Sequence, residues 1–187
     1  MSSSSPETSS SSSSFLQFQP TCDLYDKYLD QARVPSTMDW KSFGGTTTFW
    51  GVAITMKCLE DNSRLKELCY TPAPASTLPH LLVVDAGGSR RCAILGDLLA
   101  KEACHNQWAG VIVNGCVRDA AALAHIPLGI FALGTTPRKS TRRGEGQTNI
   151  PVQIGDVLCY PGDYVFADQD GVLILDPKIV KGEKGSG

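Results

Sequence analysis

Three charged residues, Asp97, Arg118 and Asp119, are the strongest candidates for chemistry in this sequence of 187 residues. The planar guanidinium of Arg118 could clamp a carboxylate or polarise a carbonyl oxygen. The Asp119 carboxylate could hold a hard divalent cation. An adjacent Arg–Asp pair is also common on protein surfaces, so the pair alone does not establish a site.

A second feature surrounds Asp97, in the run Gly96, Asp97, Leu98 and Leu99. If this run forms the first turn of a helix, its free backbone N–H groups and the positive end of the helix dipole could bind a carboxylate or phosphate. Ordinary helix packing is the alternative for this segment taken by itself. The Gly87-Gly88 pair does not match the GxGxxG pattern and is more typical of a turn.

The elements that must position these residues follow from short apolar runs. Residues 80–85, 110–115 and 128–133 are rich in Val, Ile and Leu, which predicts buried strands. Helices are expected between them, from the Gly-Gly break to about residue 105 and over 118–124. This alternation indicates parallel strands. The three charged residues then lie near the carboxyl ends of neighbouring strands, where open α/β sheets bind ligands.

The flanking segments give the rest of the fold. We expect a helix over 21–32 with Thr21 as its N-cap, a strand over 47–58 and a short helix over 61–69. The last third predicts short strands over 152–154, 157–160, 165–167 and 172–175, separated by turns. The basic loop, defined here as residues 138–143, carries four cations and is typical of a solvated loop. Together these patterns predict a mixed β/α domain with a β-rich C-terminal half.

Composition excludes several classes of protein. Lys and Arg number 17 against 19 Asp and Glu, so the nonspecific attraction on which most nucleic-acid binders rely is missing, and no direct nucleic-acid partner is expected. No apolar run reaches the length of a membrane span, and a cytoplasmic location is the expectation. The seven cysteines stand singly, as expected for reduced thiols and not for a disulfide framework or a zinc site.

The sequence resembles the RraA-like family, which includes the regulator of ribonuclease activity A and the 4-hydroxy-4-methyl-2-oxoglutarate aldolases. The resemblance covers roughly residues 20–176 and is carried by residues 83–96, 108–119, 127–130, 144–146 and 162–172. Aldolase members carry an Asp, twenty intervening residues and then Arg-Asp. Asp97 and Arg118 have that spacing here, and Asp119 follows. The regulator branch lacks the second Asp, so Asp119 favours an enzyme.

The resemblance implies a fold and a site. The fold would be a swivelling β/β/α domain of the RraA type, α/β with a mixed sheet, over 20–178. Composition, and not the resemblance, predicts a disordered Ser-rich leader at 1–19 and a flexible tail at 179–187. Gly96, Asp97, Leu98 and Leu99 would bind the substrate carboxylate, with Asp97 and Arg118 as catalytic residues. Arg118 would also bind substrate, and Asp119 would hold a divalent metal cation, Mg²⁺ or Mn²⁺. The chain would form a homotrimer or hexamer.

Two functions from different classes follow. The first is a metal-dependent lyase that cleaves 4-hydroxy-2-oxo acids of the 4-hydroxy-4-methyl-2-oxoglutarate type to pyruvate, through a pyruvate enolate. Oxaloacetate decarboxylation, which passes through the same enolate, would be a side activity. The second is a non-catalytic regulator that inhibits a ribonuclease by protein–protein binding. That role needs a surface and no metal.

Overall fold

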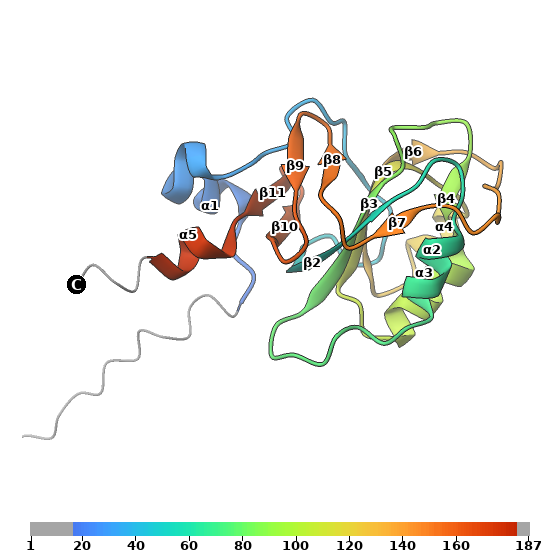
Figure 1. The fold of residues 1–187 in the computed structure, drawn as a ribbon, viewed down its shortest axis with the longest axis horizontal. Helices are drawn as coiled ribbons and strands as arrows, with labels where there is room; N and C mark the ends of the chain where they lie inside the picture. The colour runs from blue at the N-terminus through green and yellow to red at the C-terminus, as the bar shows by residue number, and fades with distance from the viewer. Residues whose placement is uncertain (1–16, 183–187) are drawn as a thin grey trace, which may run out of the picture.

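A computed structural model describes residues 17–182 (Figure 1). Its helices are α1 (Thr21–Tyr28), η2 (Leu29–Gln31, a 3₁₀ turn), α2 (Ser63–Cys69), α3 (Asp97–His105), α4 (Ala120–Leu123) and α5 (Pro177–Gly182). Its strands are β1 (Lys41–Ser42), β2 (Phe49–Lys57), β3 (His80–Asp85), β4 (Ala93–Leu95), β5 (Gly110–Val117), β6 (Gly129–Thr135), β7 (Gln147–Thr148), β8 (Val152–Ile154), β9 (Val157–Cys159), β10 (Tyr164–Asp168) and β11 (Gly171–Leu175). More residues lie in strands than in helices, and the prediction of a β-rich C-terminal half is confirmed.

The main sheet is mixed, and its centre is parallel. The strand order is β1-β6-β5-β3-β2-β10-β11, with β4 added to β5 and β7 added to β2. Strands β2, β3, β5 and β6 run parallel to one another, which confirms the parallel pairing predicted from the alternating pattern. Strands β10, β11 and β1 pair antiparallel at the two ends.

Both faces of the central strands are buried, because each side chain along β3 finds an apolar layer. Leu82 and Val84 pack toward α2, α3 and α4, which lie together on one side of the sheet (Figure 1). Leu81 and Val83 point to the opposite face, where they join the cluster that contains β8 and β9. This two-sided burial is the reason that β3 is continuously apolar.

A third cluster closes the end of the sheet formed by β10 and β11. There α1 and α5 pack Leu24, Tyr28 and Val180 against Trp50 and Phe166, at the end of the molecule away from α3 (Figure 1). Residues 179–182 of the expected tail therefore belong to α5, and the remainder of that tail lies outside the described residues. Residues 1–16 of the expected leader also lie outside them. Within residues 17–182, no helix is long and apolar enough to cross a bilayer.

Two helix predictions are corrected. Helix α1 ends at Tyr28, because Leu29 adopts a left-handed backbone with φ of 44° and begins the 3₁₀ turn. Pro20, not Thr21, occupies the N-cap position. The Thr21 hydroxyl and N–H instead donate to the buried Asp168 carboxylate, each at 2.7 Å. The expected helix over about 89–105 also begins late, since β4 precedes it.

Candidate functional site

Strands β4 and β5 bring the candidate residues together. Strand β4 lies parallel to the second half of β5, with Leu95 beside Val117. The Arg118 N–H donates to the Leu95 carbonyl at 2.9 Å. Gly96 and Arg118 therefore leave adjacent strand ends, and the strand that precedes Gly96, β4, was not predicted from the sequence.

Gly96 allows the two segments to approach closely. It holds the N-cap position of α3 with an extended backbone, φ of −134°, that any residue could adopt. A Cβ at this position would lie 2.9 Å from Asp119 Oδ2 and 3.0 Å from Arg118 Cγ. A side chain at this position would therefore displace Asp119 or Arg118, whereas the backbone conformation itself does not need glycine. The Asp119 carboxylate lies against the N-terminus of α3.

Asp119 has a backbone that side chains seldom adopt. Its φ of 59° and ψ of 38° are left-handed, a region that Asp tolerates better than most residues. It stands at the N-cap position of α4, yet its side chain makes no capping hydrogen bond. Oδ2 instead accepts a hydrogen bond from Arg118 Nε at 3.1 Å, and 37% of the Arg118 and 34% of the Asp119 side chain remain exposed. Such outliers often mark functional sites.

Asp97 begins α3 and pairs with Lys101 one turn later. Lys101 Nζ donates to Asp97 Oδ2 at 2.7 Å. This hydrogen bond lowers the pKa of Asp97; partial burial acts against it, and the positive charge of Lys101 adds to it. Asp97 is therefore a carboxylate at neutral pH and can accept a proton. Sequence reasoning gave Lys101 no role, although the i, i+4 spacing was a signal for the pair.

All the predicted site residues line one cavity of about 180 Å³. Its walls are formed by Asn62, Ala93, Ile94, Gly96, Asp97, Leu98, Leu99, Arg118, Asp119, Lys139 and Arg142. Leu99 is buried in the core below the cavity, whereas the Leu98 side chain is 68% exposed. The first-turn residues of α3 lie in this wall; their N–H groups have no helical carbonyl as acceptor, and the Leu98 N–H already meets the Asp97 carboxylate.

Five lining residues were not predicted as site residues, and three of them are polar or charged: Asn62, Lys139 and Arg142. Asn62 precedes α2, and its Nδ2 donates to the Ile94 carbonyl at 3.2 Å. Its Oδ1 is buried and accepts no hydrogen bond within the described part of the chain. Lys139 and Arg142 belong to the basic loop, which sequence analysis took for a solvated segment. No local sequence signal connects that loop to α3.

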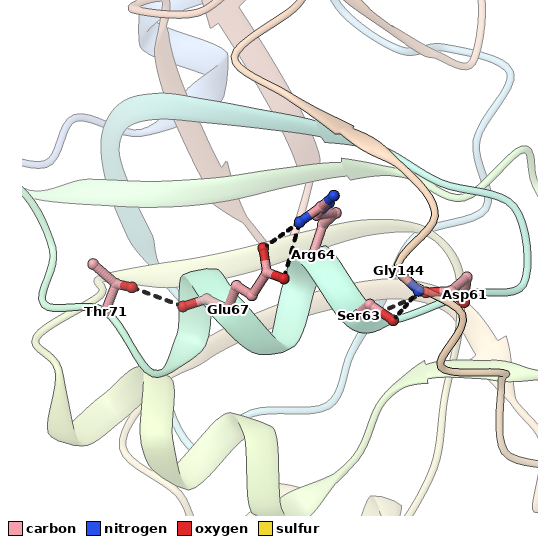
Figure 2. A network of polar contacts seen from close by, with 6 residues as sticks. All are labelled: Asp61, Ser63, Arg64, Glu67, Thr71 and Gly144. Carbon is pink, nitrogen blue, oxygen red and sulfur yellow. Dashed lines mark hydrogen bonds and ion pairs between the residues drawn. The ribbon is translucent and has the colours of Figure 1, made fainter.

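The basic loop is held by the segment that leads into α2. The buried Asp61 carboxylate accepts hydrogen bonds from the Ser63 N–H at 2.8 Å and from the Arg143 N–H. The Ser63 hydroxyl accepts one from the Gly144 N–H at 2.9 Å, and Figure 2 shows Asp61 and Ser63 meeting Gly144 at the start of α2. The backbone of the loop is therefore held beside the cavity, while its cationic side chains are exposed, as expected for a solvated loop.

The donor set suits only some metals. Within residues 17–182, no cluster of three or more His, Cys, Asp or Glu side chains could enclose an ion. Asp119 presents a partly exposed carboxylate whose Oδ1 is not used in the Arg118 pair. Mg²⁺ commonly takes one or two protein carboxylates and completes its coordination with water and substrate oxygens. The residues fit a cation of that kind better than a closed four-ligand zinc site.

The sequence of this chain matches a known protein family. A family model described as RraA-like, Aldolase/RraA, matches residues 21–174. A relative from Alcanivorax borkumensis named "Putative 4-hydroxy-4-methyl-2-oxoglutarate aldolase" is 44% identical over 160 residues, which are 86% of this chain and 98% of the relative. A relative of the same name from Shewanella oneidensis is 42% identical over 157 residues, covering 84% and 93%.

Solved structures agree with the fold. A protein from Geobacillus kaustophilus, described as an S-adenosylmethionine:2-dimethylmenaquinone methyltransferase, superposes with a TM-score of 0.79 at 40% identity, covering 86% of this chain and 98% of that one. The RNA-processing inhibitor RraA from Thermus thermophilis gives a TM-score of 0.78 at 38% identity, covering 85% and 93%. The resemblance to the RraA-like family is thereby confirmed, and this chain belongs to that family.

Proposed function

We propose that the protein is a divalent-metal-dependent lyase that cleaves 4-hydroxy-2-oxo acids of the 4-hydroxy-4-methyl-2-oxoglutarate type to pyruvate. The observation that carries the proposal is the convergence of Arg118, Asp119 and the N-terminus of α3 on one cavity. An anion-binding helix end, a fixed cation and a metal-binding carboxylate are the groups that such a cleavage requires. The aldolase name borne by relatives up to 44% identical supports the same chemistry.

The substrate's 2-oxo acid end would bind between these groups. Its carboxylate would accept hydrogen bonds from the first N–H groups of α3, where the helix dipole favours negative charge. Arg118 would donate to the keto oxygen with its planar fork. The ion pair with Asp119 holds the guanidinium at the edge of the cavity. The arrangement orients the C3–C4 bond of the substrate relative to Asp97.

In the proposed cleavage, Asp97 takes the proton of the 4-hydroxyl group through a water molecule. The C3–C4 bond breaks, C4 becomes the carbonyl carbon of the departing product, and the bonding pair passes to C3 and the C2 keto oxygen as an enolate. Return of the proton to C3 gives pyruvate. The lowered pKa of Asp97 keeps the group ionised at neutral pH, although it also makes the carboxylate a weaker base. Arg118 stabilises the enolate oxygen as its charge develops.

Oxaloacetate decarboxylation would use the same groups. There the C3–C4 bond releases CO₂ and leaves the same enolate, which Arg118 would stabilise. Asp119 would hold Mg²⁺ or Mn²⁺ in both reactions. The cation, when bound, supplies Lewis-acid withdrawal of electron density from the keto oxygen.

We also propose that copies of the chain assemble around the site as a homotrimer or hexamer. Leu98 lines the cavity and is 68% exposed, which is a large apolar surface at the mouth of a polar site. A second copy packed there would cover it and restrict the entry of water. Light scattering should give three or six times the chain mass of 20.0 kDa, and a monomer at micromolar concentration would exclude this assembly.

The second candidate function is regulation of a ribonuclease. It is favoured by the structural likeness to the Thermus RNA-processing inhibitor, at a TM-score of 0.78. That role would act through a surface and would be independent of Asp119. The two functions therefore make opposite predictions for a variant without the Asp119 carboxylate: the lyase would lose its activity, and the regulator would keep its function.

The deciding experiment measures pyruvate release from 4-hydroxy-4-methyl-2-oxoglutarate and from oxaloacetate, with and without Mg²⁺. Asp119→Asn is the matched variant, because Asn tolerates the left-handed backbone and nearly preserves the side-chain shape. We expect Mg²⁺-dependent release by the unaltered chain and its loss in Asp119→Asn at unchanged thermal stability. Mg²⁺-saturable activity in the variant would refute the metal assignment. Absence of turnover with both substrates would favour the regulator.

A further inference from the structure

The charges around the cavity are unequal, and the excess is positive. Two carboxylates line it, Asp97 and Asp119, and each already has a cation, Lys101 at 2.7 Å and Arg118 at 3.1 Å. The other two lining cations, both in the basic loop, form no ion pair within the described residues. A substrate with a single carboxylate, bound at α3 and Arg118, would leave both of them without an anion.

The nearest acidic residues of α2 do not neutralise the loop. Arg142 also borders a neighbouring cavity that Glu67 lines. Both carboxylate oxygens of Glu67 accept hydrogen bonds from Arg64, at 3.0 and 2.9 Å, as Figure 2 shows. Glu60, which precedes Asp61, accepts from Arg91. Glu67 and Glu60 are therefore already paired, and the third nearby carboxylate, Asp61, bonds the Ser63 and Arg143 N–H groups and neither lining cation.

The backbone around these two cations is fixed on both sides. Lys139 stands opposite Ala93 of β4 in a parallel bridge, and the Ala93 N–H donates to the Arg138 carbonyl at 2.8 Å. Thr141 bridges to Asp61, and the Thr141 N–H donates to the Glu60 carbonyl at 2.8 Å. The loop side chains of Lys139 and Arg142 are exposed, as expected for a solvated loop, while their backbone is held in place. Preorganised cations lose less entropy on binding an anion than cations on a mobile segment do.

We infer that Lys139 and Arg142 recognise a second carboxylate of the substrate, so that the site selects 2-oxo acids with two carboxylates over those with one. This inference rests on the proposed function for the position of the first carboxylate, at α3 and Arg118. The basic loop forms a separate part of the wall, from a different region of the chain. A diacid can then meet both groups of cations, with its reacting carbons between them. Lys139 and Arg142 thus determine specificity and do not take part in bond breaking.

The test compares matched ligands and matched variants. 2-Oxoglutarate and 2-oxopentanoate differ only by a methyl group in place of the second carboxylate, and neither carries the 4-hydroxyl needed for cleavage. Calorimetry with Mg²⁺ present should show the diacid binding at least about tenfold more tightly, because a hydrogen bond to a charged group is typically of that magnitude. The combined Lys139→Gln and Arg142→Gln variant should lose this preference. Arg143→Gln, which removes the adjacent exposed charge outside the cavity, should keep it.

Turnover provides the second measurement. 4-Hydroxy-4-methyl-2-oxoglutarate is compared with 4-hydroxy-4-methyl-2-oxopentanoate, in which methyl again replaces the carboxylate. The double variant should lose about tenfold or more of kcat/KM with the diacid, through KM, and less than about twofold with the monoacid. Equal loss with both substrates, an equal effect of Arg143→Gln, or an unchanged preference would overturn the inference. If nothing is cleaved but the binding preference still disappears in the double variant, the lyase proposal fails and carboxylate recognition stands.

Discussion

Replacing Asp61 by asparagine tests the anchor of the basic loop. The carboxylate is fully buried and serves two backbone donors on different oxygens, the Ser63 N–H on Oδ1 and the Arg143 N–H on Oδ2. Asparagine has nearly the same shape but only one acceptor oxygen. Whichever way the amide turns, its NH₂ group faces one of these N–H donors. One buried backbone donor loses its acceptor, which costs about 1–3 kcal/mol.

The expected result is a melting temperature lower by about 2–12 °C, since 1 kcal/mol corresponds to about 2–4 °C in a domain of this size. The Thr141 hydroxyl adds little to this cost, because it can turn to the Glu60 carbonyl at 2.9 Å. Calorimetric or circular-dichroism melting at neutral pH measures the change. Asp39→Asn is the matched control: that side chain is 79% exposed, and its loss should change stability by less than about 0.5 kcal/mol.

The pH dependence gives an independent check. Burial acts to raise the pKa of Asp61, but the hydrogen bonds from Arg143, Ser63 and Thr141 together lower it. A carboxyl whose pKa is lower in the folded protein stabilises it above the unfolded pKa, and this stabilisation is lost as the pH falls toward the folded value. The difference in melting temperature between the native chain and Asp61→Asn should therefore shrink in acid. Equal melting temperatures at neutral pH, or a difference that grows in acid, would refute the assignment of Asp61 as an ionised anchor.

Three further predictions concern the cavity. Arg118→Ala should lower kcat about 10²–10³-fold with little change in melting temperature, and Arg118→Lys should lose less; full activity in Arg118→Ala would exclude it as the group that stabilises the enolate. Lys101→Met removes the hydrogen bond and charge that lower the pKa of Asp97, so the acid limb of the pH–rate profile should move to higher pH; an unmoved limb would remove Asp97 as the base. Gly96→Ala places a Cβ 2.9 Å from Asp119 Oδ2 and should reduce turnover by up to about 10²-fold, with only a small decrease in melting temperature. Wild-type turnover in this variant would mean that the Asp119 carboxylate can shift without consequence.

Most of the central sheet could be predicted from the sequence because its signal is local. Strand β3 coincides with the predicted run at 80–85, and β5 and β6 contain most of their predicted runs, since buried parallel strands are short, β-branched and apolar. Strand β4 was missed and assigned to a helix. Three residues carry no measurable period, and Ala93–Leu95 is a strand only because β5 lies beside it.

The candidate site divides in the same way. The proximity of Asp97, Arg118 and Asp119 could be expected from the alternation of strands and helices, but β4, the strand that sets Asp97 beside Arg118, was not predicted. Lys139 and Arg142 could not, because their loop reaches the cavity through pairing with Asp61 and Ala93, far away in the sequence. A run of cations has the same composition whether it faces solvent or a ligand. The position of this run beside the cavity follows only from its pairing with Asp61 and Ala93.

The ends of the main sheet restrict how copies of this chain can associate. An unpaired strand edge is a template for further strands, which leads to fibres or to sheets that continue between molecules. At one end, β1 is only two residues long and carries Lys41. At the other, Arg33 already exchanges hydrogen bonds with Ile174 of β11, at 2.9 and 2.8 Å. Both ends of the main sheet are thus partly protected, which opposes edge-to-edge pairing between copies of this chain.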